Sequence, residues 1–231
     1  MKKLFTYFII GFILFSCGSD KKGNMVITGK IDGFKKGTFY LQKFKDTLLV
    51  TVDSLYLNGK NEFKLVDNVE SPEIYLLALD KLTDKILFFG EPGEIAISTK
   101  LSKFSTSAKV EGSKNQELLD EYNNMIQQFN GKQLDLFKQK FDAQKENNTD
   151  LVNEIEKEQN SLLKRRYQYA TNFAVNNADF EVAPYIALTD LYNANVVLLD
   201  TINNSLSNKI KTSKYGVKLQ DFITKIKDSE K

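Results

Sequence analysis

The chain has 231 residues with 32 basic and 30 acidic side chains, and 42% of its residues are hydrophobic. This balance supplies enough apolar side chains for a packed core and excludes a disordered or fibrous protein. One cysteine and no histidine exclude a disulfide framework, a Cys-x-x-Cys redox pair and the commonest zinc-binding and general-base chemistry. Any catalysis would therefore depend on carboxylates, lysine, tyrosine or hydroxyl groups, and we expect neither a metal nor another cofactor.

Residues 1–16 have the layout of a signal peptide. Lys2 and Lys3 precede an apolar run from Leu4 to Phe15, which is the order of charged and apolar regions in secretory leaders. As a helix this run would span about 18 Å, whereas the hydrocarbon core of a bilayer is about 30 Å thick. We therefore predict a cleaved leader rather than a membrane-spanning helix.

The single cysteine, Cys17, directly follows this leader. Leu14, Phe15 and Ser16 precede it, and the group resembles the lipobox of bacterial lipoproteins. The resemblance implies that Cys17 is acylated, with palmitate-type chains, and becomes the mature N-terminus; the alternative is a signal peptide with a chance cysteine at its end. Residues 17–24 would then form a lipidated tether, since acyl chains anchor a soluble domain without a membrane span.

Location and charge follow from the same segment. The tether contains one acidic residue, Asp20, which is no strong acidic signal for export to the cell surface. We therefore expect a lipid-anchored protein of the cell envelope, at the periplasmic face of the outer membrane.

Without the leader, which carries Lys2 and Lys3, 30 basic side chains remain against 30 acidic ones. Such a neutral chain offers no electrostatic surface for nucleic acid.

Residues 25–111 are predicted to form a β-rich domain, because short apolar runs alternate with turn signals. Asn58-Gly59 is typical of a primed hairpin turn, and Pro92-Gly93 fits the middle of a type II turn. The runs at 73–79 and 86–89 are apolar on both faces, which predicts central strands. We expect an antiparallel β-sandwich or a strongly curled sheet. The expected strands are residues 25–31, 37–44, 48–57, 62–66, 73–79, 86–89, 94–99 and 107–112.

Residues 112–231 are predicted to form a helical domain, so the fold class is α+β. Ser113 and Gln116 have the spacing of a capping box, and Thr149 or Asp150 is expected to cap a second long helix that forms an αα-hairpin with the first. Pro184 suits the first turn of a third helix, and residues 198–210 and 215–226 supply two shorter ones. The helical stripes expected in the core are Leu118, Tyr122, Met125, Ile126, Phe129, Leu134, Phe137 and Phe141, followed by Leu151, Ile155, Leu162, Tyr169 and Phe173.

One tight basic group lies in the second long helix. It consists of Lys164, Arg165 and Arg166. A phosphate or headgroup site is one interpretation, but on a neutral protein we favour a solvated helix face paired with Glu156 and Glu158.

Several motifs follow one another in an order that resembles a known family. They are the lipobox, TGKIDGF with GTFYLQKF, DSLYLNGKNEF, YLLALD, FFGEPGEIAIS, VEGSKNQEL and SKYG. Together they resemble the domain of unknown function that precedes the thioredoxin domain in envelope lipoproteins of the alkyl hydroperoxide reductase and thiol-specific antioxidant type. The resemblance runs from Met25 to the C-terminus. In that family a thioredoxin domain with Cys-x-x-Cys usually follows the SKYG helix. No residue here matches that pair, so the resemblance implies only the non-catalytic part.

Two further groups of residues are candidate sites. Glu91 and Glu94 flank a turn, and two carboxylates about 5–5.5 Å apart would suit a retaining glycosidase. An exposed hairpin tip, however, lacks the cleft that perturbs a carboxylate pKa, so we expect no catalysis there.

The second group consists of Thr47, Ser54 and Thr201. Each follows an aspartate and precedes an aliphatic residue, as in O-glycosylation acceptors of some bacterial envelopes. The favoured interpretation is that Asp-Ser and Asp-Thr pairs mark turns and strand ends.

The sequence therefore predicts a non-enzymatic, lipid-anchored envelope protein that works by binding. The partner would be a separate thioredoxin-like protein or another envelope component. A carboxylate-based hydrolase or a glycan-binding protein of the envelope is the alternative, and a structural spacer is a third. A concave aromatic patch would favour glycan, an exposed apolar helix surface would favour a protein partner, and paired buried carboxylates in a cleft would favour the enzyme.

Overall fold

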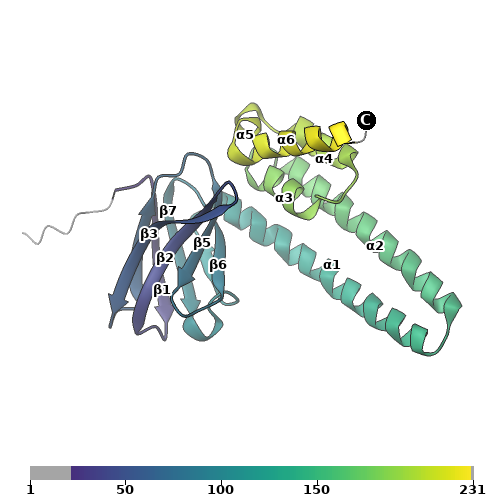
Figure 1. Ribbon diagram of the computed structural model, residues 1–231, viewed down its shortest axis with the longest axis horizontal. Coiled ribbons are helices and arrows are strands. Elements are labelled where there is room, and N and C mark those ends of the chain that lie inside the picture. The colour runs from purple at the N-terminus through teal and green to yellow at the C-terminus, as the bar shows by residue number, and fades with distance from the viewer. Residues whose placement is uncertain (1–21, 230–231) are drawn as a thin grey trace, which may run out of the picture.

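A computed structural model describes residues 22–229 and confirms the α+β fold: a sandwich of strands is followed by helices (Figure 1). Cys17 and the predicted leader lie outside the described residues. The strands are β1 (Met25–Asp32), β2 (Lys36–Lys45), β3 (Leu48–Asn58), β4 (Glu62–Asp67), β5 (Glu73–Leu79), β6 (Lys85–Gly90), β7 (Gly93–Lys100) and β8 (Lys109–Glu111), with a 3-10 turn, η1 (Leu101–Lys103), after β7. The helices are α1 (Lys114–Lys145), α2 (Thr149–Asn176), α3 (Val182–Asp190), α4 (Val196–Ser205), α5 (Asn208–Lys211) and α6 (Lys214–Ser229).

The sandwich consists of two four-stranded sheets. One has the order β4-β1-β7-β8 and the other β3-β2-β5-β6. All pairs are antiparallel except β1 with β7, which run parallel with Met25 opposite Gly93. Gly59 has a positive φ of +75°, as expected for the predicted turn at Asn58-Gly59. The predicted hairpin is wrong, however, because β3 and β4 belong to different sheets and this turn carries the chain between them. The Pro92-Gly93 turn does not close a hairpin, because it carries the chain from one sheet to the other.

Strand β5 is central and buried on both faces, as predicted. Strand β6 is instead an edge strand, although its sequence is equally apolar. The reason is that its two faces enter two different cores. Phe88 packs inside the sandwich, whereas Phe89, with Ile74 opposite it on β5, belongs to the core of the helical part. The helices therefore cover this part of the sheet and share its apolar side chains.

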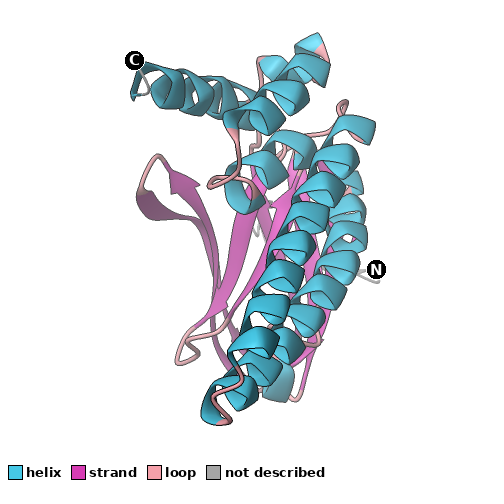
Figure 2. Ribbon diagram, turned by 90° about the vertical axis from the view of Figure 1, so that its right-hand side faces the viewer, coloured by secondary structure: helices cyan, strands magenta, loops and turns pink. Residues whose placement is uncertain are grey.

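Helices α1 and α2 form the predicted hairpin, whose tip points away from the sandwich (Figure 1). The shorter helices gather at the end of the hairpin opposite its tip (Figure 2). The helical core is one cluster near the base, and the hairpin has a small core of its own farther out, formed by Leu136, Ala143, Ile155 and Leu162. Within residues 22–229 no helix is both long and apolar enough to cross a membrane.

The predicted core stripe of α1 is wrong beyond Gly131. Leu134, Phe137 and Phe141 are 70%, 55% and 55% exposed. The side of α1 that faces α2 carries Leu136 and Ala143 instead, and this side lies roughly 100° or more around the helix from the exposed stripe. Met125 and Leu151 are also exposed at the surface.

The caps differ in detail from the prediction. Helix α2 is capped by Asn148, whose side chain accepts a hydrogen bond from the Leu151 N–H at 3.1 Å, rather than by Thr149 or Asp150. Pro184 lies in the first turn of α3 as predicted, where its missing N–H costs nothing.

Candidate functional site

The junction between sandwich and helices begins at the SKNQ motif, residues 113–116. Ser113 Oγ accepts a hydrogen bond from the Gln116 N–H at 3.1 Å, which confirms the predicted N-cap. The predicted capping box is otherwise wrong. Its second hydrogen bond would run from the Ser113 N–H to the Gln116 side chain, but Gln116 Oε1 accepts instead from the Phe89 N–H at 2.9 Å. Phe89 lies on the edge strand β6, so Gln116 satisfies a main-chain donor that would otherwise stay unpaired in a buried place.

Asn115 joins three elements at the same junction and is 2% exposed. Its Nδ2 donates to Glu91 Oε2 at 2.8 Å and lies 3.5 Å from Glu181 Oε2, and its Oδ1 accepts from the Val182 N–H at 3.0 Å. Glu91 also accepts from the Lys114 N–H at 2.5 Å. The turn after β6 and the starts of α1 and α3 are thus held together by one amide and two carboxylates.

The SKYG motif, residues 213–216, forms the other half of the junction. Tyr215 Oη accepts a hydrogen bond from the Ile74 N–H at 2.9 Å, and Lys214 Nζ donates to the Phe44 carbonyl at 3.0 Å and pairs with Glu73. The ladder between β2 and β5 ends one residue earlier, at Lys43 opposite Tyr75. Helix α6 therefore supplies partners to the two main-chain groups left over where β2 separates from β5.

Gly216 completes the motif by allowing a close backbone approach. A Cβ atom at this position would lie 1.9 Å from the Ile210 carbonyl oxygen, which no side chain permits.

A polar network continues from this junction into the sandwich. Lys43 Nζ lies 2.8 Å from Asp67 Oδ2 and 3.2 Å from Glu73 Oε1, and Tyr75 Oη donates to Asp67 at 2.7 Å. Burial alone would favour the neutral forms of Lys43 and Asp67. The hydrogen bonds and opposite charges around each residue outweigh this effect of burial. The pKa of Lys43 is therefore raised and that of Asp67 is lowered. Burial, followed by the bond to Asp67, raises the pKa of Tyr75. The pair thus stays charged at neutral pH and stabilises the junction.

A cleft of about 520 Å³ opens beside the junction. Glu181 at its wall is 3% exposed. Its pKa is raised chiefly by burial, against the opposing effects of a main-chain hydrogen bond from its own residue, of Lys209 and of Asn115. Glu91 also lines the cleft, whereas Glu94 is exposed on the outer face of β7. The expectation of an exposed Glu91–Glu94 pair is therefore wrong, since the second carboxylate near Glu91 is Glu181. The cleft is lined by Glu70, Ser71, Pro72, Glu91, Pro92, Glu181, Lys209, Thr212 and Ser213.

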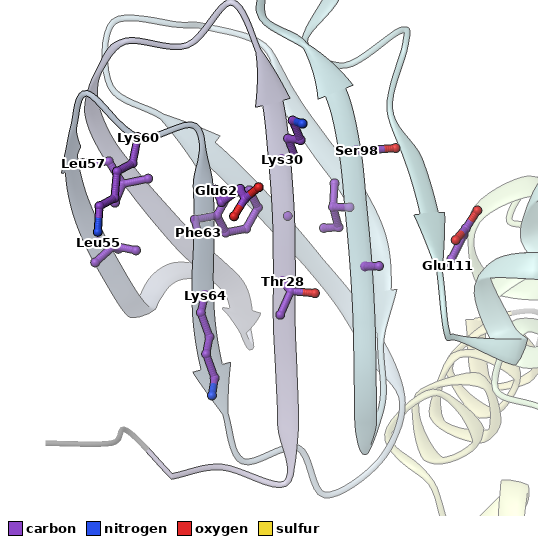
Figure 3. Close-up of a pocket in the computed structure, with 13 residues that line it drawn as sticks. Thr28, Lys30, Leu55, Leu57, Lys60, Glu62, Phe63, Lys64, Ser98 and Glu111 are labelled. Carbon is purple, nitrogen blue, oxygen red and sulfur yellow. The ribbon is translucent and has the colours of Figure 1, made fainter. Parts of the chain in front are cut away.

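A larger groove of about 670 Å³ crosses the sheet that contains β1 (Figure 3). Small side chains lie along its middle, namely Thr28, Ala96 and Ser98, and Lys30 lies directly between Glu62 and Ser98 in the strand register. The charged residues of its rim are Lys30, Lys60, Glu62, Lys64 and Glu111. The groove therefore offers a polar surface of mixed charge.

The groove has an apolar floor on the β3 and β4 side, formed by Leu55, Leu57 and Phe63. Gly29 makes room for the Phe63 ring, because a Cβ there would lie 2.2 Å from Phe63 Cζ. Phe63 is 4% exposed, so it provides no flat aromatic surface for a sugar ring.

The predicted glycosylation residues lie apart from one another. Thr47 is exposed in the turn between β2 and β3, and Ser54 is exposed on β3. Thr201 is exposed within α4, where its Oγ1 donates to the Val197 carbonyl at 2.7 Å. The three residues remain predictions as acceptors, and the structure brings no two of them together. Cys17 lies outside the described residues.

The basic group has partners other than those predicted. Arg166 pairs with Asp190 at 3.2 Å, and Asp190 also accepts from Tyr122 Oη at 2.7 Å. Glu156 and Glu158 pair instead with Lys140 and Lys132 of α1. Lys164 and Arg165 are exposed on α2, so the helix-face interpretation stands with different partners.

Sequence reasoning missed the cleft, although its motifs were visible. SKNQ and SKYG belong to the motifs that carry the family resemblance, but the sequence predicted a structural role only for Ser113 and Gln116, in the helix cap. The signal lay in the polar side chains next to the cap, because an amide placed beside a helix N-cap can reach groups on a neighbouring element.

The sandwich is thus joined to the helices by hydrogen bonds from two polar motifs, SKNQ and SKYG, with a cleft and a groove beside them. Residues 25–119 match a family described as a domain of unknown function, DUF4369. The match covers all eight strands and the SKNQ motif. No curated protein and no solved structure matches the chain. The DUF4369 region thus contains Glu91 of the cleft and Asn115, which donates a hydrogen bond to it, whereas Glu181 and Lys209 come from the part of the chain that follows the match. Among residues 22–229 no group of three or more acidic, histidine or cysteine side chains could hold a metal ion.

Proposed function

We propose that this protein is a lipid-anchored binding module of the cell envelope, in which the DUF4369 sandwich and the helical part form one rigid unit that recognises another envelope protein. The groove across β4, β1 and β7 is the observation that carries the binding role. Its volume of about 670 Å³ lies within the range of functional clefts.

The chemistry of the surface supports a protein partner over a glycan. The groove has a mixed-charge rim and no exposed aromatic ring among its lining residues, whereas Leu134, Phe137 and Phe141 form an exposed apolar stripe on α1. Exposed apolar surface of this kind favours contacts with proteins. A separate thioredoxin-like protein is the partner suggested by the resemblance of the sequence motifs, since it would restore in trans the domain that usually follows SKYG in that family.

Site-specific photo-crosslinking tests the binding role. A photoreactive amino acid at Ser98, in the middle of the groove, is expected to trap a discrete envelope protein in intact cells. The same amino acid at Asn172, an exposed position of α2, is the matched control. A crosslinking pattern that is identical at the two positions would refute the groove as the binding surface.

A carboxylate-based hydrolase is a second candidate, and one observation favours it. Asn115 contacts both Glu91 and Glu181 in the cleft, and burial raises the pKa of Glu181, as is typical of a general acid. Against it, both oxygens of Glu91 accept hydrogen bonds that hold the start of α1. An assay of glycan hydrolysis separates the two candidates. If the wild type hydrolyses envelope glycans and the Glu181→Gln variant does not, the result favours the hydrolase over a binding module.

A further inference from the structure

The cleft between sandwich and helices has an uneven distribution of charge. Three carboxylates line it, from Glu70, Glu91 and Glu181, against one cation, Lys209. Glu70 and Lys209 are exposed at the rim, and Glu181 is buried. The interior of the cleft is therefore negative, and its one positive group lies at the mouth.

Two polar groups of this cleft have hydrogen-bonding capacity that the protein leaves unused. Besides a main-chain hydrogen bond from its own residue, the buried Glu181 carboxylate has a contact between Oε2 and Asn115 Nδ2, which at 3.5 Å is longer than the 2.7–3.2 Å of ordinary hydrogen bonds. The Oγ of Ser71 is buried and has no hydrogen-bond partner among the described residues. Leaving a buried polar group without a full set of hydrogen bonds is unfavourable, so a ligand that supplies donors here would be stabilised.

A ligand that carries positive charge and several N–H donors would satisfy both groups at once. An ammonium group has three donors and one charge. A metal ion is less suited, because no described residues form a metal-binding group. We propose that the cleft binds the primary ammonium group of a small zwitterion, whose acidic end lies toward Lys209 at the mouth. The volume of about 520 Å³ accommodates such a molecule.

The place where the tether joins the sandwich suggests a source for this ligand. Asn24 is fixed by side-chain and main-chain hydrogen bonds of 2.8–3.1 Å to Asn68, Val69 and Gly93, which adjoin the cleft residues Glu70 and Pro92. If Cys17 is acylated, as the proposed function holds, the seven residues to Asn24 span at most about 25 Å. The cleft would then lie near the membrane surface, where the aminoethyl phosphate headgroup of a phospholipid presents this chemistry; a free aminoethyl phosphate is the other source.

Calorimetric titration of the full-length chain in detergent with O-phosphoethanolamine tests the cleft directly. We expect saturable binding, at least 10-fold weaker binding by the Glu181→Gln variant, and unchanged binding by Glu94→Gln, a matched change outside the cleft. Phosphocholine, whose nitrogen has no N–H donor, should bind at least 10-fold more weakly. Thermal unfolding checks that each variant is folded, and Ser71→Ala, expected to weaken binding several-fold, replaces Glu181→Gln if that variant does not fold.

The inference is overturned if O-phosphoethanolamine does not bind, if phosphocholine binds equally well, or if the cleft variants bind like wild type. Vesicles with and without phosphatidylethanolamine, mixed with a Cys17→Ser variant that cannot be acylated, separate the two sources. Selective binding to the phosphatidylethanolamine vesicles supports the lipid headgroup, and binding of the soluble compound alone supports the free zwitterion. Because the titration needs no anchor, its failure leaves the proposed anchoring and the groove to their own tests.

Discussion

The hydrogen bond from Ile74 to Tyr215 links the sandwich to the last helix, and its removal tests whether the two parts form one unit. In a Tyr215→Phe variant the ring keeps its contacts with Phe89 and Tyr185, whose centroids lie 6.2 and 5.4 Å away. Only the acceptor of the Ile74 N–H, at 2.9 Å, is lost. Because Ile74 is buried, its N–H stays unsatisfied, which costs about 1–3 kcal/mol.

For a chain of this size such a loss lowers Tm by roughly 2–12 °C. Circular dichroism during thermal unfolding measures it, and we expect sheet and helix signals to disappear together, at a lower temperature than in wild type. Tyr56→Phe is the matched control, because Tyr56 is 54% exposed and its change should cost less than about 0.5 kcal/mol. Equal Tm values for Tyr215→Phe and Tyr56→Phe would refute the structural role of the SKYG motif.

Three other expectations follow. Phe137→Gln on the exposed stripe should change the free energy of unfolding by less than about 0.5 kcal/mol, whereas Leu136→Ala in the hairpin core should lower it by about 2–5 kcal/mol. Urea unfolding measures both changes, and equal losses of stability would place the stripe in the core. The pKa of Glu181 is raised in the folded protein, so ionisation of this carboxyl opposes folding. The folded state is therefore favoured by the protonated form, and this contribution is lost as pH rises from about 4.3, the pKa in the unfolded chain, through the raised pKa. Glu181→Gln should therefore be more stable than wild type at pH 7 and similar below pH 4, and a pH-independent difference would contradict this. With Cys17 acylated no thiol remains for exchange, so insulin reduction should equal the buffer blank, and turnover above it would contradict a non-redox role.

The strands could be predicted because their signals are local. Turn residues such as Asn58-Gly59 and the alternation of apolar side chains depend on neighbours in the sequence. The parallel pairing of β1 with β7 could not be predicted in this way, because Met25 and Gly93 meet only after the chain has crossed between the sheets several times. Such pairings depend on the packing of the whole domain.

The error in the α1 stripe has a similar cause. Periodicity shows that Leu134, Phe137 and Phe141 share a face, but it does not show which face meets α2. In the structure the hairpin buries the small side chain of Ala143 and leaves Phe141 exposed. The polar side chains beside the helix cap indicated that Asn115 could reach another element, but the sequence pattern could not show which one. Glu91 and Glu181 lie far apart in the chain and meet through Asn115.

The state of Cys17 tests the account most directly, since the proposed anchor decides where the protein works. Metabolic labelling with a palmitate analogue, followed by fractionation of the cells, compares wild type with Cys17→Ser. We expect the wild type to be labelled and recovered with the membrane, and the variant to be unlabelled and recovered as a soluble or uncleaved form. A correctly cleaved Cys17→Ser protein that remains in the membrane fraction without label would contradict the lipid anchor.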